Sequence, residues 1–183
     1  MAHAAVEGLE GFTILQNDQW KNGTANFSEH GLISPETAMK MPLSSRILFS
    51  LSALGLAVGA HMADFFSNTH IFNDRWPPHA KFHTGQTLSM SILLGVMSVF
   101  FAWRKTADNK TTVYAAAGFA VLYWITQATA ILYPNTAFYD PEFVTSNSFP
   151  LGLPGQAYFE IGFLAVIGLA SWLALRKDAR WVE

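Results

Sequence analysis

Four long apolar stretches alternate with polar segments along the chain. They lie within the predicted spans 45–66, 79–104, 112–132 and 156–175, and the apolar part of the second span begins at Gln86. A helix needs about 20 predominantly apolar residues to cross the hydrocarbon core of a bilayer. Residues 47–58 and 163–175 are apolar or small on every side, whereas the helices of a soluble bundle keep a polar outer face. The pattern therefore predicts four transmembrane helices, the second of which begins outside the hydrocarbon core.

The segments between the spans predict how these helices are connected. Residues 104–110 are a short polar turn, and residues 135–154 are a longer loop rich in proline and aromatic residues that could cover an opening. Connections of this kind join helices that run alternately up and down. We expect residues 43–183 to form an all-α integral membrane domain, an up-down-up-down bundle of four transmembrane helices. We expect the polar segment 1–42 to be cytoplasmic and partly a surface helix or disordered.

Lysine and arginine are distributed unevenly between the two ends of the predicted bundle. Only Arg75 and Lys81 belong to the end without the termini. Cytoplasmic loops carry an excess of these residues, so we expect both termini in the cytoplasm, and location in the endoplasmic reticulum if the chain is eukaryotic. A net charge of −2 without a basic patch argues against a nucleic-acid partner. The residues at the basic end are Lys40, Arg46, Arg104, Lys105, Lys110, Arg176, Lys177 and Arg180.

Polar side chains gather at the end of the predicted bundle opposite the termini. Residues 61–86 hold four of the chain's six histidines. Spacings of three and four residues put the polar side chains of each span on one helical face, and alternating helices bring these faces to the same membrane surface. We expect a polar chamber near the non-cytoplasmic surface. The candidates are His61, Asp64, His70, Asn73, Trp76, His79, His83, Gln86, Tyr123, Trp124, Gln127 and Glu160.

Acid–base catalysis is the first interpretation of this set. Carboxyl groups at membrane depth are rare and usually functional, and one in an apolar chamber can keep a proton and donate it at neutral pH. Histidine titrates near neutral pH and can take a proton back. We predict isomerisation, cyclisation or epoxide ring opening of a lipophilic small molecule of secondary metabolism, terpenoid or polyketide in type, without a cofactor. The predicted catalytic residues are Asp64, Glu160, His61, His79 and His83.

The remaining candidates are predicted to bind the substrate, and aromatic rings among them could stabilise a developing cation. This group consists of His70, Asn73, Trp76, Gln86, Tyr123, Trp124 and Gln127. The expected partners are this substrate and membrane lipid, and a homodimer is left open.

Two other functions fit the same residues. His79 and His83 are one helical turn apart, as in histidine metal pairs, and His61 and Asp64 could complete a zinc or non-haem iron site of an oxidoreductase or hydrolase. The absence of cysteine excludes thiolate ligands. The third function is a non-catalytic subunit that binds a lipid or a sterol.

The run HxxD…THxFNxxWPPHAxxHxxQ between His61 and Gln86 resembles the signature of a largely uncharacterised family of small four-span membrane proteins from bacteria and fungi. The resemblance implies the topology given above and no reaction. More loosely, the chain is similar to membrane isomerases of the emopamil-binding type and to fungal membrane-bound terpenoid cyclases. Those proteins also place acidic and histidine residues in a membrane chamber, although this chain is shorter.

Overall fold

A computed structural model describes residues 38–183 of the protein. Most of the predicted N-terminal segment 1–42, with its expected surface helix or disorder, lies outside the described residues. Four helices are long and apolar enough to cross a membrane, and no strand longer than an isolated bridge occurs in residues 38–183. The helices are α1 (Leu43–Ala60), α2 (Pro78–Trp103), α3 (Asn109–Thr129) and α4 (Gly155–Leu175).

Short helical turns extend two of these helices and punctuate the long loop. A π-helical turn, η3 (His61–Phe65), continues α1, and the 3-10 turn η4 (Ala130–Leu132) continues α3. The loop before α4 contains the 3-10 turns η5 (Pro141–Phe143) and η6 (Pro150–Gly152). With these extensions the four membrane helices have 23, 26, 24 and 21 residues, close to the predicted spans and sufficient for about 30 Å of hydrocarbon.

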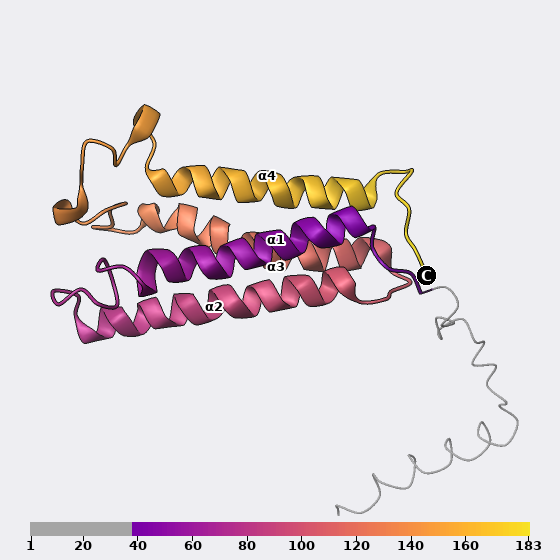
Figure 1. Ribbon diagram of the computed structural model, residues 1–183, viewed down its shortest axis with the longest axis horizontal. Helices are drawn as coiled ribbons and strands as arrows, with labels where there is room; N and C mark the ends of the chain where they lie inside the picture. The colour runs from indigo at the N-terminus through magenta and orange to yellow at the C-terminus, as the bar shows by residue number, and fades with distance from the viewer. Residues whose placement is uncertain (1–37) are drawn as a thin grey trace, which may run out of the picture. The chain divides into compact units, whose positions relative to one another are not determined.

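The helices run antiparallel to their neighbours in the chain, and α1 also packs against α4, which closes the bundle (Figure 1). The connection 66–77 and the loop 133–154 lie together at one end of the bundle. The α2–α3 turn and the C-terminal segment lie at the other end. The predicted four-helix transmembrane bundle is therefore confirmed.

Small side chains line the contacts between helices. The buried positions of α2 alternate at spacings of four and three residues. Small residues let membrane helices approach closely, and a methyl group at Gly95 would lie 3.3 Å from Cβ of Ala53 on α1. Between α2 and α3, the buried Ser98 hydroxyl donates to the Ala116 carbonyl at 2.9 Å. The buried positions of α2 are Thr84, Leu88, Ser91, Gly95, Ser98 and Ala102.

Large apolar side chains cover the outside of the bundle. Leu93, Leu54, Phe159 and Ile161 are each between 59% and 65% exposed. Such a surface is unfavourable in water and matches the hydrocarbon tails of a bilayer. The outer face therefore agrees with the prediction of an integral membrane protein.

Candidate functional site

The π-helical turn at the end of α1 holds two of the predicted catalytic residues, His61 and Asp64. Its backbone is closed by a hydrogen bond from the Phe66 N–H to the His61 carbonyl at 2.9 Å. Single π-helical turns are uncommon and frequently occur at functional sites, because the wider turn redirects side chains. The chain leaves the helix directly after this turn and enters the connection to α2.

The side chains of Asp64 and His70 are in contact across this connection. Asp64 Oδ1 lies 3.3 Å from His70 Nδ1, and both side chains are partly buried. His70 Nδ1 is also 2.8 Å from the Thr69 hydroxyl, which donates its own proton to the Ala63 carbonyl at 3.1 Å. With the proton of the neutral ring on Nδ1, where the Asp64 and Thr69 oxygens can accept it, Nε2 of His70 can accept a proton. An aspartate that orients a histidine in this way is a recurring element of acid–base sites.

His61 is fixed in the corresponding tautomer by a backbone contact. Its Nδ1 lies 2.8 Å from the Ala57 carbonyl, which can only accept, so Nε2 of the neutral ring is the basic nitrogen. The ring lines a shallow groove of about 270 Å³ between α1 and α2, together with Val58, Met62 and Ile92. Ligand sites for drug-sized molecules begin near 300 Å³. The groove is therefore large enough for part of a lipophilic molecule.

The connection 66–77 is held in shape by its own polar groups. The Asn73 amide donates to the Thr69 carbonyl at 3.3 Å, and its oxygen accepts from the Arg75 N–H at 2.9 Å. The side chain of Asn73, a predicted substrate-binding residue, thus bonds within the loop. The edge of the Trp76 ring packs against His70, with ring centroids 4.9 Å apart.

Four buried polar atoms at this end of the bundle have no hydrogen-bond partner among residues 38–183. They are Nε1 of Trp76, Nε1 of Trp124, Oε1 of Gln127 and Oε1 of Glu160. The Trp124 and Glu160 side chains are only 6% and 8% exposed. Buried polar atoms in proteins are nearly always hydrogen-bonded. The four atoms therefore suit a ligand or water with polar groups of its own.

A stacked aromatic pair positions three of these atoms. The Trp124 ring on α3 stacks on Phe163 of α4, with centroids 4.6 Å apart and planes 8° from parallel. Gln127 lies about one turn from Trp124, and Glu160 lies about one turn from Phe163, both toward the same end of the bundle. Tyr123 is buried beside Trp124 in an edge contact, with centroids 5.6 Å apart. The end of α3 and the start of α4 therefore place these predicted residues at the same level.

The helix α2 differs from the prediction. His79, His83 and Gln86 are exposed and contact one another: Nε2 of the two histidines are 3.1 Å apart, and His83 Nδ1 is 3.2 Å from Gln86 Oε1. The inward positions of α2 include Thr84 and Leu88 instead. The expectation that all four helices direct their polar faces into one chamber is therefore corrected for α2, whose three candidates lie on an outer face.

The proposed set of four metal ligands is not gathered either. Within residues 38–183, no three histidine, aspartate or glutamate side chains lie close enough together to hold a metal ion. His79 and His83 pair on the exposed face of α2, while Asp64 pairs with His70. The residues therefore do not fit a zinc or iron site with three protein ligands.

Two contacts at this end were missed by the sequence analysis. One is the contact of His70, a predicted substrate-binding residue, with Asp64. Arg75 forms an ion pair with Glu142 of η5, which joins the connection 66–77 to the long loop. Glu142 lies in an irregular segment without periodicity, so no sequence pattern indicated its partner.

Residues 48–180 match a family of unknown function, DUF6640. The chain belongs to this family. The match covers all four membrane helices except the first residues of α1, and it assigns no activity to any residue. No curated protein and no solved structure matches the chain. Membership of DUF6640 agrees with the predicted resemblance to an uncharacterised membrane family, and any function must come from the geometry of the site.

Proposed function

We propose that the protein is a membrane enzyme that moves protons on a lipophilic small molecule and so isomerises, cyclises or ring-opens it. One observation carries the proposal: buried polar atoms without partners lie at the same end of the bundle as the Asp64–His70 pair. An unpaired buried polar group is destabilising, so these atoms favour a bound ligand or water that pairs with them. A substrate with an oxygen atom would pair with them.

The roles follow from the groups present. Glu160 gives a proton to an epoxide or carbonyl oxygen or to an alkene, and the Trp124 and Tyr123 rings stabilise the positive charge that develops. Nε2 of His70, oriented by Asp64, takes a proton from a neighbouring carbon or from the water that opens an epoxide. In an isomerisation or cyclisation one proton is added and one is removed, so substrate and product have the same composition. The proton returns from His70 to Glu160 between turnovers.

The membrane supplies the route of entry in this proposal. The groove beside His61 opens on the outer face of α1 and α2, which is apolar. A lipophilic molecule concentrates in the bilayer and reaches this groove without crossing water. His79 and His83 take no part in the proposed step, because they lie on the exposed face of α2. The excess of basic residues at the other end favours cytoplasmic termini, a site toward the lumen, and the endoplasmic reticulum in a eukaryotic host.

Comparative metabolite analysis tests the proposal. Lipid extracts from cells that express the wild type, Asp64→Asn or Glu160→Gln are compared by liquid chromatography and mass spectrometry. Asp74→Asn is the matched control, since Asp74 is an exposed aspartate of the same connection. We expect a product that the wild type and Asp74→Asn form and that the other two variants do not.

Two results would contradict the proposal. One is an undiminished product in both Asp64→Asn and Glu160→Gln. The other is a wild-type protein that retains a lipophilic molecule through purification and never converts it. In that case Asp64→Asn and Glu160→Gln would change only the amount of this molecule that the protein retains. That second result would support a non-catalytic binding subunit.

A further inference from the structure

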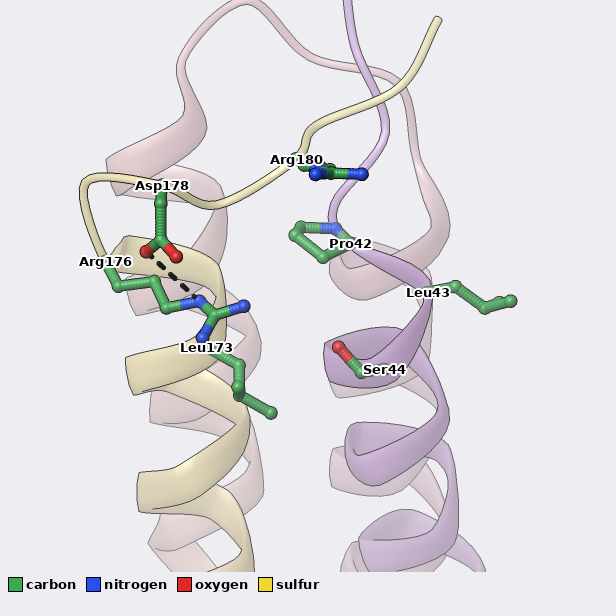
Figure 2. Close-up of a pocket in the computed structure, with 7 residues that line it drawn as sticks. All are labelled: Pro42, Leu43, Ser44, Leu173, Arg176, Asp178 and Arg180. Carbon is green, nitrogen blue, oxygen red and sulfur yellow. Dashed lines mark ion pairs between the residues drawn. The ribbon is translucent and has the colours of Figure 1, made fainter.

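A cavity of about 500 Å³ lies at the basic end of the bundle, at the opposite ends of α1 and α4 from Asp64 and Glu160. It is bounded by the start of α1 and the end of α4, and Figure 2 shows Ser44 and Arg176 extending into the space between these helices. Nothing in the proposed reaction uses this cavity.

Two guanidinium groups line the cavity. Arg176 Nε lies 3.4 Å from Asp178 Oδ1, a contact that occupies one edge of the guanidinium and leaves its terminal nitrogens available to a second acceptor. Arg180 also lines the cavity and forms no ion pair with any residue of the range 38–183. Asp178 is 77% exposed, so solvent screens its charge more than that of Arg176, which is 40% exposed. The cavity therefore carries a net positive charge.

The start of α1 adds hydrogen-bond donors to the same wall. The first backbone hydrogen bond of α1 runs from the Arg46 N–H to the Pro42 carbonyl at 3.1 Å. The N–H groups of residues 43–45 precede that bond and have no intrahelical acceptor, and they carry the positive end of the helix dipole. The Ser44 hydroxyl lines the cavity beside them. Arginine side chains and helix N–H groups together are the donors that proteins direct at phosphate.

The C-terminal segment that carries Arg180 is fixed across the bundle. The Trp181 indole donates to the Ala174 carbonyl at 3.0 Å. Lys40 and Val182 exchange two backbone hydrogen bonds of 2.5 and 3.1 Å. The segment that carries Arg180 is therefore hydrogen-bonded both to α4 and to the segment before α1. These contacts hold Arg180 at the wall of the cavity.

The position of the cavity relative to the membrane indicates the source of the anion. The membrane helices α1 and α4 begin and end at Leu43 and Leu175, so the cavity lies where hydrocarbon gives way to headgroups. Leu173 lines it on the hydrocarbon side. We propose that this cavity binds the phosphate of an anionic phospholipid, with Arg176, Arg180 and Ser44 on the phosphate and Leu173 against the acyl chain. Basic pockets between membrane helices bind such headgroups in other proteins.

Native mass spectrometry of the full chain in detergent tests this site. The protein is mixed with equal amounts of phosphatidylglycerol and phosphatidylcholine, and the retained lipid is counted. We expect one phosphatidylglycerol per chain, with its affinity reduced about thirtyfold in Arg176→Gln/Arg180→Gln and about fivefold in Arg180→Gln alone. Lys177→Gln is the matched control, since it removes an adjacent positive charge outside the cavity, and it should retain the lipid.

Three results would overturn the proposal. In the first, the wild type retains phosphatidylcholine as well as phosphatidylglycerol. In the second, Arg176→Gln/Arg180→Gln retains as much phosphatidylglycerol as the wild type. In the third, Lys177→Gln loses as much of this lipid as the double variant does. A parallel sample contains inorganic phosphate without lipid. If free phosphate protects the wild type against thermal unfolding as well as phosphatidylglycerol does, the ligand is free phosphate and the lipid assignment is wrong. Circular dichroism measures the helical content of each variant and so shows whether it is folded. If the double variant is not folded, the single Arg180→Gln variant provides the test.

Discussion

Replacing Gly55 by alanine should destabilise the contact that positions the candidate site. A methyl group at Gly55 would lie 2.4 Å from Cζ and 2.5 Å from Cε1 of Phe163. Ordinary contacts between carbon atoms are near 3.5–4 Å, so the ring must retreat by about 1 Å. Trp124 is stacked on the same ring and limits that movement. Inserting a methyl group into a packed core costs about 1–3 kcal/mol.

Gly59→Ala is the matched control for this prediction. Gly59 is on the same helix, and a methyl group there would have no atom of the described residues within 4 Å apart from its own helix neighbourhood. Both substitutions gain the same helix propensity of about 1 kcal/mol, so the difference between them isolates the overlap with Phe163. We expect Gly55→Ala to be less stable than Gly59→Ala by about 1–3 kcal/mol.

Unfolding in mixtures of a mild detergent and sodium dodecyl sulfate measures this difference. Tryptophan fluorescence follows the transition, and a changed emission of folded Gly55→Ala would report the disturbed stack at Trp124. If Gly55→Ala is as stable as Gly59→Ala, then α1, Phe163 and Trp124 do not pack as described. The positions of Glu160 and Gln127 would then also be in doubt.

Three further perturbations test other parts of the structure. Arg75→Gln should raise hydrogen exchange in residues 133–154 by about 1.4- to fivefold, because a surface ion pair typically contributes about 0.2–1 kcal/mol. Exchanging the charges of Arg75 and Glu142 should restore protection, and unchanged exchange in Arg75→Gln would contradict the role of this pair. Ser98→Ala should lower stability in the same detergent assay by about 0.6 kcal/mol, and a loss above 2 kcal/mol would show that more than one interhelical hydrogen bond depends on it. Hydrogen bonds from the Thr111 hydroxyl and N–H hold the pKa of Asp108 below its usual value. This contribution is complete above the unfolded pKa of about 3.9 and is lost as the pH falls through the lower folded pKa. The wild type should therefore lose stability relative to Asp108→Asn below about pH 4, and parallel curves would refute the assignment.

The fold could be predicted because the length of an apolar run is tied to the thickness of the bilayer. Each predicted span agrees with a helix to within a few residues, since few other structures satisfy a backbone in hydrocarbon. Which face of α2 is exposed could not be predicted from the positions of its polar residues. Spacing correctly placed His79, His83 and Gln86 on one face, but the face that packs inward is the one that carries small residues. In membranes, where lipid is as apolar as a leucine side chain, small residues are the better indicator of an interface.

The Asp64–His70 pair could not be predicted because no periodicity connects its members. The five residues between these positions include the end of a π-helical turn and part of an irregular connection. By contrast, the shared level of Gln127 and Glu160 followed from the up-down topology and helical spacing. Helical spacing therefore predicted which residues share a level along the bundle, whereas contacts that depend on a loop had no pattern to indicate them.

The central claim is that the buried polar groups at the end of α3 and the start of α4 hold a ligand. A high-resolution structure of the protein in lipid nanodiscs, prepared from cells that express it, tests this claim most directly. We expect density within hydrogen-bond distance of the Glu160 carboxyl group and the Trp124 indole, elongated toward the groove beside His61. A map in which these side chains bond to one another, or turn to the lipid with no density between them, would contradict it.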